Sequence, residues 1–189
     1  MVRPATPWRG AGRTMGVLKR LAQQHGEAVE IHIFGCSDAA IEEFGLDRDF
    51  HFTNHGVLVH EDVANLLRFA DMFIDLSTHQ AFGLTALEAM ACGCAVVVPL
   101  SGGAAEYAVD GENSLVVDTG MEEDCLQAAT RLIAGPELRR RLQTVALQTA
   151  AKFTLEGAAA SQLGLFSEFL ATRRGVETSG GATFVADGS

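Results

Sequence analysis

The chain has little positive charge and no long apolar run. Its 189 residues include 14 Lys and Arg against 24 Asp and Glu, which gives a formal net charge of −10. So acidic a chain repels the phosphate backbone, and we expect no nucleic-acid partner. Its apolar stretches fall well short of the roughly 18 residues that a membrane-spanning helix needs. The first residues also lack the apolar centre of a signal peptide.

Cysteine is scarce, with four residues at Cys36, Cys92, Cys94 and Cys125. Cys92 and Cys94 are separated by one residue, which is too close for a zinc pair of the usual spacing. We interpret all four as small core or near-core residues of a protein in the reducing cytoplasm.

The few basic residues are concentrated near the start, where five of the 14 lie in the first 20 positions. Lys19 and Arg20 fit a solvated helix face. Arg3 and Arg9 lie in a loop rich in Pro and Gly before that helix. Arginine binds anions bidentately, so these two side chains can converge on one phosphate group.

Short apolar runs alternate with helical patterns along most of the chain. This alternation predicts an α/β fold, a Rossmann-like doubly wound parallel sheet with helices on both faces and a helical C-terminus. We expect strands at 30–34, 50–53, 72–76, 95–98 and 114–117, and helices at 11–25, 38–44, 60–69, 122–134, 137–152 and 154–172. Residues 1–172 would form the domain, and residues 173–189, dominated by Gly, Ser, Thr and Asp, a flexible tail.

Residues 80–93 form the most informative stretch of the chain. A polar turn follows an apolar run, and Gly83 and Leu84 then open a helix of strong helix formers. A strand, a glycine turn and a helix together point backbone N–H groups at an anion. Glu88 is the one acid of this helix and suits a ribose hydroxyl pair. An ordinary buried crossover with a chance acid remains the alternative.

This stretch resembles the nucleotide-sugar site of retaining GT-B glycosyltransferases of family 4, also called group 1. Glu88 matches the second Glu of their Glu-x7-Glu motif, and Phe82-Gly83 and residues 89–93 fit around it. Gln80 stands in place of the first Glu. Further matching motifs follow in order at 95–99, 101–106 and 110–117, and the match as a whole extends from about Arg3 to about Phe153.

The resemblance implies that the chain binds a sugar donor linked to UDP, TDP or GDP, without a metal or other cofactor. It implies catalytic roles for Arg3, Arg9, Gln80 and Glu88. It also implies donor contacts from Arg3, Arg9, Gly10, His55, Gln80, Phe82, Gly83, Leu84, Thr85 and Glu88. The arginines would hold the diphosphate, Glu88 the ribose and His55 the base. His79, next to Gln80, either touches the sugar or faces solvent.

Gln80 departs from the family pattern. An amide can bond to sugar hydroxyls, but it carries no charge to stabilise an oxocarbenium-like transition state. We therefore expect it to recognise a sugar, for instance a deoxy-sugar, and the local motif resembles rhamnosyltransferase-like members of surface polysaccharide biosynthesis. A polar surface turn is the alternative role for Gln80, and a helix-surface position the alternative for Glu88.

Part of a GT-B enzyme has no counterpart here. Only Met1 and Val2 are available for a first strand, and nothing corresponds to the N-terminal acceptor domain. We therefore expect the C-terminal, donor-binding half of a larger enzyme, inactive alone, in the cytoplasm or at the inner face of the membrane. An uncovered sheet edge would invite pairing with another copy, which predicts a homo-oligomer.

Two rival functions remain. The first is a sugar-nucleotide epimerase or phosphorylase domain of the same fold. The second is a non-catalytic assembly or regulatory domain, which Gln80 and the absent half favour. The retention of Arg3, Arg9 and Glu88 argues against the second, because a site that no longer binds a donor would not need all three.

Overall fold

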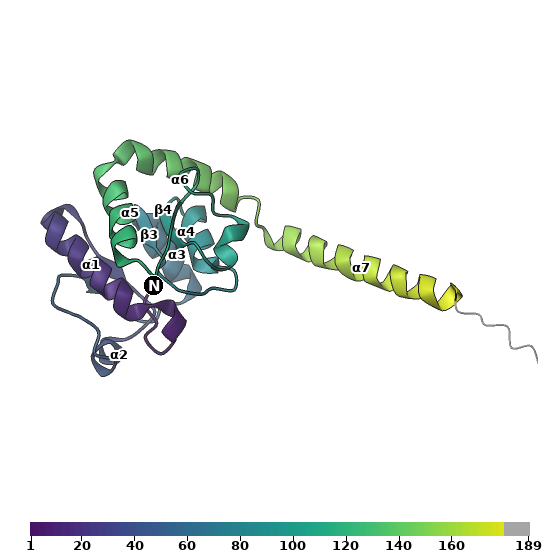
Figure 1. Ribbon diagram of the computed structural model, residues 1–189, viewed down its shortest axis with the longest axis horizontal. Helices are drawn as coiled ribbons and strands as arrows, with labels where there is room; N and C mark the ends of the chain where they lie inside the picture. The colour runs from purple at the N-terminus through teal and green to yellow at the C-terminus, as the bar shows by residue number, and fades with distance from the viewer. Residues whose placement is uncertain (180–189) are drawn as a thin grey trace, which may run out of the picture. The chain divides into compact units, whose positions relative to one another are not determined.

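The computed structural model describes residues 1–179, with side chains described as far as residue 173. The chain divides into two units, Met1–Ala151 and a second one that begins at Lys152. The first unit holds both sheets and every helix except the last (Figure 1). The predicted domain ended at residue 172, whereas the first compact unit of the structure ends at Ala151.

All strand pairs are parallel, as the sequence predicts. β1 (His32–Ile33) pairs with β2 (Thr53–Asn54) in one sheet. β3 (Met72–Ile74), β4 (Ala95–Pro99) and β5 (Leu115–Val117) form a second sheet in the order β3-β4-β5. The α/β fold with parallel pairing is confirmed, but the strands form two sheets rather than one.

The helices lie close to the ranges that the sequence predicts. In the first unit they are α1 (Ala11–His25), α2 (Asp38–Glu43), α3 (His60–Phe69), α4 (Leu84–Ala91), α5 (Glu122–Ala134) and α6 (Pro136–Ala150). Short 3-10 turns cover Pro7–Arg9, Gly26–Ala28 and Gly103–Glu106. Pro136 begins α6 directly after Gly135, because proline fits the first helical position, where no backbone N–H is required.

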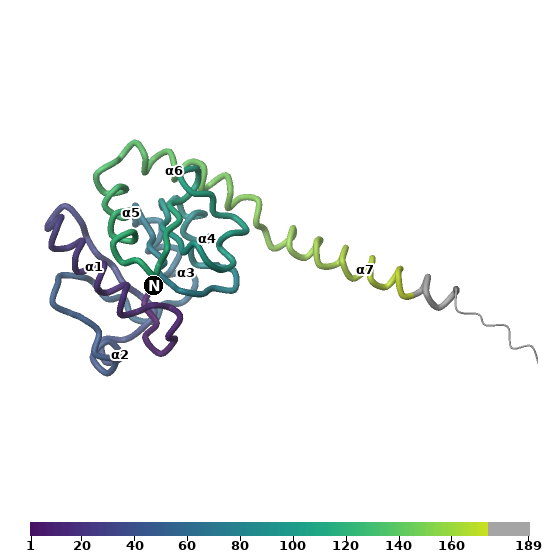
Figure 2. Tube along the Cα trace, in the orientation of Figure 1, coloured from purple at the N-terminus to yellow at the C-terminus, as the bar shows by residue number. Residues whose placement is uncertain are grey.

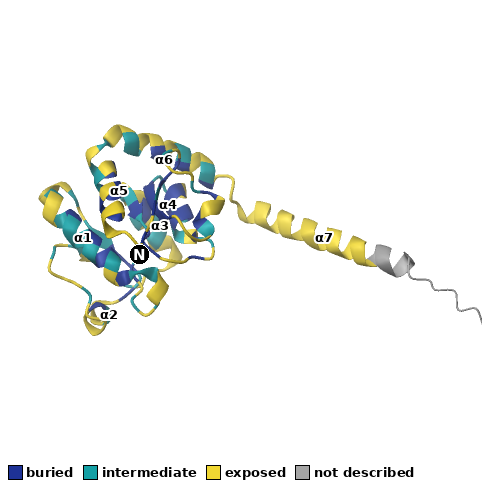
Figure 3. Cartoon of the chain, in the orientation of Figure 1, coloured by how far each residue is buried: buried dark blue, intermediate teal, exposed yellow. Residues whose placement is uncertain are grey.

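β4 is the centre of the core, and all five of its residues are buried (Figure 3). Val96 and Val98 pack with residues of α3 and α4, whereas Ala95 and Val97 pack with residues of α1 and α5. Successive side chains of a strand point to opposite faces, so this division places helices on both faces of the sheet. The doubly wound arrangement is confirmed.

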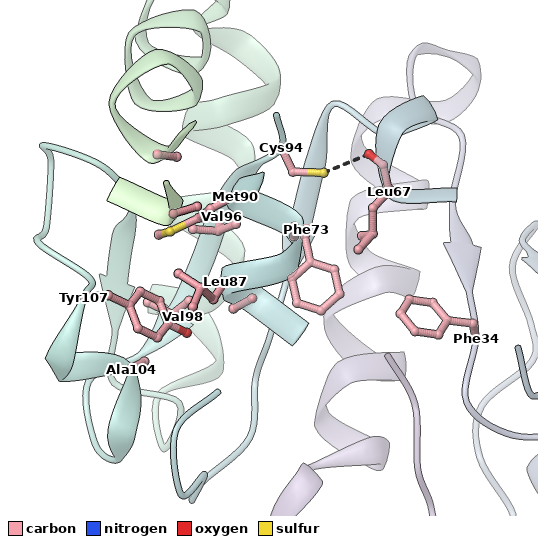
Figure 4. Packing of buried hydrophobic residues seen from close by; sticks show 14 residues of the cluster. Phe34, Leu67, Phe73, Leu87, Met90, Cys94, Val96, Val98, Ala104 and Tyr107 are labelled. Carbon is pink, nitrogen blue, oxygen red and sulfur yellow. Dashed lines mark hydrogen bonds between the residues drawn. The ribbon is translucent and has the colours of Figure 1, made fainter. Parts of the chain in front are cut away.

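The core cluster on the α3 and α4 side is drawn in Figure 4. Here the thiol of Cys94 donates a hydrogen bond to the carbonyl of Leu67 over 3.1 Å. Burial raises the pKa of Cys94 to about 12. Cys36 and Cys125 are also buried and Cys92 is partly buried, all as free thiols. The interpretation of the cysteines as small core residues is confirmed.

The second unit contains α7 (Leu155–Ser179). This helix extends seven residues beyond the predicted end at 172, because the sequence continues with Arg173-Arg174, which are good helix formers. The predicted flexible tail therefore overlaps a helix over residues 173–179, and its remaining residues, 180–189, lie outside the described part of the chain. Among the helices of residues 1–179, none combines the length and apolar character required to span a membrane.

Candidate functional site

A crevice of about 750 Å³ lies beyond the carboxyl ends of the strands. Five segments line it: the loop before α1, the turn after β1, the α2 segment with Ala40 and Phe44, residues 57–63 after β2, and the first turns of α4. Open α/β sheets bind ligands at this end, where successive crossovers diverge. The position of the crevice alone makes it the first candidate for a binding site.

Arg3 and Arg9 both reach this crevice from the loop before α1, traced in purple in Figure 2. Three sets of hydrogen bonds hold the loop. Val2 N–H donates to the Phe34 carbonyl over 2.8 Å, Arg9 N–H donates to Thr6 over 2.9 Å, and Trp8 accepts from Thr78 N–H over 2.8 Å. The structure thus brings together the two arginines that the sequence singles out.

Gly10 shapes the same loop without lining the crevice. Its φ of 62° is left-handed, and a Cβ at this position would lie 2.6 Å from the carbonyl oxygen of Leu76. Only glycine fits that approach without strain. Arg13 closes the contact from α1, because its Nη1 donates to the same carbonyl over 3.0 Å.

The start of α4 forms the opposite wall of the crevice. Gly83 precedes the helix with a φ of 83°, and its carbonyl accepts hydrogen bonds from Tyr107 Oη over 2.8 Å and from Ala86 N–H over 3.1 Å. Leu84 and Thr85, whose N–H groups belong to the first helical turn, line the crevice. Helix N-termini attract anions, so this wall adds to the positive charge of the arginines.

Glu88 lies one turn further along α4, on the same crevice. Its side chain is 36% exposed, and Oε1 lies 3.9 Å from Nδ1 of His60. An ion pair forms between them only when the imidazole is protonated. Glu88 is therefore an accessible carboxylate about one helical turn from the anion-binding end of α4, at a place where ribose hydroxyls can reach it.

Sequence reasoning missed His60 as a lining residue. It begins α3 and its side chain is 87% exposed, so it belongs to the rim of the crevice rather than to the core. The available signal was its position directly after Val57, Leu58 and Val59, an apolar run with no strand partner.

His55 lies next to His32 rather than in the crevice. The N–H of His55 donates to the carbonyl of Ile33 over 2.9 Å, which extends the pairing of β2 with β1 by one residue. This backbone contact holds the two rings together, with His55 Nε2 3.0 Å from His32 Nδ1. Apolar residues form the wall where the base was expected, including Phe34 and Leu58. His55, to which the sequence assigns the base, is not among the residues that line the crevice.

Gln80 is buried, with 6% of its surface exposed. Its amide nitrogen donates to the carboxylate of Asp75 and lies 3.3 Å from Ser77 Oγ. Ser77 Oγ in turn donates to Asp75 over 2.6 Å. Gln80 is therefore no surface turn residue, and it does not line the crevice. The signal for this cluster was Asp75, an acid inside the apolar run at 72–76.

The loop of Gly102 and Gly103 packs directly on the segment that follows Gln80. Gly103 N–H donates to the Gln80 carbonyl over 2.9 Å. A Cβ at Gly103 would overlap the carbonyl oxygen of Ala81 and the Cα of Phe82. Phe82 packs on Tyr107 with ring centroids 5.6 Å apart. Gly103 therefore serves the approach of two loops, and Phe82 belongs to that packing rather than to the crevice lining.

Five of the ten expected donor contacts are thus absent from the crevice lining: Gly10, His55, Gln80, Phe82 and Gly83. His79 is exposed, and Glu106 is exposed at the end of a 3-10 turn. Within the part of the chain that the structure describes, no three His, Cys, Asp or Glu side chains are grouped to hold a metal ion. Arg3, Arg9, Leu84, Thr85 and Glu88 are the predicted site residues that meet in one place.

Doubly wound parallel domains form a class of α/β proteins that bind nucleotides at the carboxyl ends of their strands, and the crevice lies at that end. Residues 1–149 match the family model described as glycosyl transferases group 1. The chain belongs to this family, which confirms the resemblance recognised in the sequence.

Several relatives are D-inositol 3-phosphate glycosyltransferases. The protein of Saccharomonospora viridis is 35% identical over 115 residues, which cover 61% of this chain and 27% of the relative. That of Mycobacterium tuberculosis is 37% identical over 100 residues, which cover 51% of this chain and 21% of the relative. The chain thus spans about a quarter of the length of these relatives.

Solved structures share the fold. Sucrose-phosphate synthase from Thermosynechococcus elongatus superposes with a TM-score of 0.73 at 24% identity, over 88% of this chain and 43% of that one. HepE from Anabaena, in complex with UDP and glucose, superposes with a TM-score of 0.71 at 21% identity, over 86% of this chain and 45% of that one. The C-terminal domain of LpcC from Francisella tularensis superposes with a TM-score of 0.65 at 20% identity, over 77% of this chain and 80% of that one. The chain thus has the fold of the C-terminal half of a GT-B protein.

Proposed function

We propose that this domain binds the nucleoside diphosphate sugar of a glycosyltransferase, which transfers the sugar to a glycan or lipid-linked acceptor with retention. One observation carries the proposal: Arg3, Arg9, the start of α4 and Glu88 line a single crevice of about 750 Å³. Two arginines and a helix N-terminus suit a diphosphate, and the carboxylate suits a ribose.

Each wall of the crevice has a role in this proposal. The diphosphate lies between the arginine loop and the N–H groups of Leu84 and Thr85, and the base lies against Phe34 and Leu58. As the sugar departs, negative charge grows on the diphosphate, and Arg3 and Arg9 stabilise it. We expect this to occur without a metal ion, because the arginines and the helix supply the positive charge.

UDP is the first nucleotide to test, because HepE, which shares the fold, was crystallised with UDP. TDP and GDP are the alternatives. Our hypothesis for the sugar is a deoxy-sugar such as rhamnose. Four further points stay predictions: an N-terminal acceptor domain, inactivity of the isolated half, pairing with another copy, and a cytoplasmic location.

A non-catalytic assembly or regulatory role is the second candidate, favoured by the burial of Gln80 away from the crevice. Donor binding and sugar transfer separate the two candidates. A domain that binds donor and supports transfer once an N-terminal half is added is part of an enzyme. A folded domain that binds no donor either has the second role or needs the N-terminal half to complete its site.

The test is calorimetric titration of the full chain with UDP, TDP and GDP. Arg9→Ala and Glu88→Gln are each expected to weaken binding about tenfold or more, since bonds to charged groups contribute about 1.5–3 kcal/mol. Arg20→Ala and Glu123→Gln are matched controls, because these residues pair with each other at 2.9 Å on the surface of α1 and α5. EDTA should leave the affinity unchanged. Equal losses in the controls would contradict the assignment.

A further inference from the structure

α7 exposes its apolar side chains to solvent. From Leu155 to Arg173, the range over which its side chains are described, every residue is exposed (Figure 3). The large apolar side chains of this range are between 55% and 88% exposed: Leu155, Leu163, Leu165, Phe166, Phe169 and Leu170. Six side chains of this exposure present on the order of 600 Å² of apolar surface, the upper limit for the largest patch of a soluble monomer. Such a patch indicates a binding surface.

The large apolar side chains share one side of the helix. Leu163, Phe166 and Leu170 recur at spacings of three and four residues, and Leu165 and Phe169 form a second row beside them. Residues at these spacings lie on one face of a helix with 3.6 residues per turn. Small or polar residues occupy the opposite side: Gly157, Ser161, Gly164 and Glu168. We call the apolar side the α7 face.

Side-chain size is distributed unevenly along the α7 face. Ala158 and Ala159 lie toward its start, whereas Phe166, Phe169 and Leu170 lie further along. Two parallel copies of the face would set phenylalanine against phenylalanine and alanine against alanine, which leaves a void at the alanine end. Two antiparallel copies would pack the large side chains of each helix on the alanines of the other, as close packing requires.

Charge favours the same orientation. Glu156 lies in the first turn of α7, and Arg173 holds its guanidinium 5.6 Å from the centre of the Phe169 ring, at the edge of the α7 face. An antiparallel register can bring Glu156 of one helix level with Arg173 of the other. The same register brings Ala159 level with Leu170, because both pairs share one midpoint in the sequence. One register thus satisfies charge and packing together, whereas parallel copies would place like charges level with each other.

We propose that the α7 face binds the α7 face of a second copy of the chain, with the two helices antiparallel. Both copies use the same surface, so the contact is isologous and closes as a dimer. Two faces of this size would together bury about 1,200 Å², the lower limit for a specific interface. We therefore expect a reversible dimer rather than a permanent one. The inference does not depend on the proposed function.

A lipid surface fits the α7 face less well than a second copy does. Helices that lie on membranes carry many Lys and Arg on their polar side, which bind anionic headgroups. Within the described range from 155 to 173, Arg173 is the single basic residue, and Glu156 and Glu168 are acidic. Anionic lipid would repel these acids, whereas a second copy supplies an arginine level with Glu156.

Sedimentation of the full chain over a range of concentrations tests the dimer. The mass is expected to rise from 20.1 kDa toward twice that value as the concentration increases. Phe166→Glu places a charge within the α7 face of each copy, so it should weaken the dimer at least about tenfold. Ser161→Glu is the matched control, because it adds the same charge to the opposite side of the helix and should leave the dimer unchanged.

Charge reversal tests the antiparallel register. Glu156→Arg and Arg173→Glu should each weaken the dimer about threefold or more, because each brings like charges together. The double variant should recover the original affinity. In a parallel dimer neither reversal would change the affinity, since like charges already face each other. Thermal unfolding of the first unit is the folding control, because these positions lie outside it.

Two outcomes would overturn the proposal. One is a chain that stays monomeric at millimolar concentration, whether or not the helix then binds added anionic vesicles. The other is a dimer that Phe166→Glu and Ser161→Glu affect equally, because a surface other than the α7 face would then form it.

A dimer that Phe166→Glu disrupts but that charge reversal leaves unchanged would overturn the antiparallel register.

Discussion

Gln80 shows how one residue can depart from a family motif while keeping a structural purpose. Its amide donates to the buried carboxylate of Asp75, which also accepts from Ser77. A glutamate could not donate in this way when ionised. The amide at position 80 therefore matches the acid at position 75, and the two belong together as a pair.

Restoring the family's acid should be destabilising. Gln80→Glu places two carboxylates in contact within a buried site, and we expect a loss of about 3 kcal/mol in the free energy of unfolding at neutral pH. Urea unfolding at neutral pH measures this loss.

A second substitution isolates the pairing. Asp75→Asn supplies a donor for the new carboxylate, so the double variant should recover most of the lost stability in a double-mutant cycle. If Gln80→Glu is as stable as the original chain at neutral pH, the hydrogen bond between Gln80 and Asp75 does not hold this loop.

At the same scale, residue chemistry selected side chains that the structure brings together. Arg3, Arg9 and Glu88 were proposed because a charge in an unusual setting needs a partner, and all three line the crevice. His55 lies directly after β2 and its ring contacts His32, a neighbour that no local pattern reveals. His60 was missed because helix starts on the rim of a crevice are recognisable only after the strands are placed.

At the scale of elements, the contact between two loops depends on a glycine. Gly103→Ala should cost about 3 kcal/mol or more, because the new Cβ overlaps backbone atoms of Ala81 and Phe82. The control is Gly12→Ala in α1, where a Cβ meets nothing within 4 Å. We expect the control to gain about 0.5–1 kcal/mol from helix propensity. Thermal unfolding of both variants separates the two cases, and equal stabilities would contradict the close approach.

Elements with a long, regular pattern were predicted well. α1 and α3 have the bounds that periodicity gives, and α6 begins at Pro136, one residue before the predicted start. The strands are shorter than predicted at β1 and β2, which within the described residues pair only with each other. α7 is longer, because helix propensity continues after residue 172. The length of a strand depends on the neighbouring strands with which it pairs, and the sequence of one segment does not specify those neighbours.

At the scale of the whole molecule, buried groups of the core make the stability of the fold sensitive to pH in the alkaline range. Burial raises the pKa of Cys94 from 9.0 to about 12, and desolvation raises the pKa of Tyr107 as well. The unfolded chain releases the thiol proton first, so stability should fall as the pH rises from about 9 toward 12. Cys94→Ala should lower stability at neutral pH by about 1–2 kcal/mol and flatten this decline. An unchanged pH slope in urea unfolding would contradict it.

The arrangement of the whole domain was only partly predictable. Alternating apolar and helical segments gave the parallel doubly wound class, and β4 with its helices on both faces matches it. The division of the strands into two sheets, β1-β2 and β3-β4-β5, was not predictable, because the order of strands in space is set by crossovers rather than by any one run of residues.

The most direct test of the donor site is hydrogen exchange of the full chain with and without saturating UDP. The crevice predicts slower exchange in four segments that are far apart in sequence, residues 3–10, 35–37, 57–60 and 84–88, with little change in α5 and α6. Protection in those four segments together would establish one nucleotide site at the ends of the strands. No protection, or protection confined to other segments, would contradict the assignment of the crevice to a nucleoside diphosphate sugar.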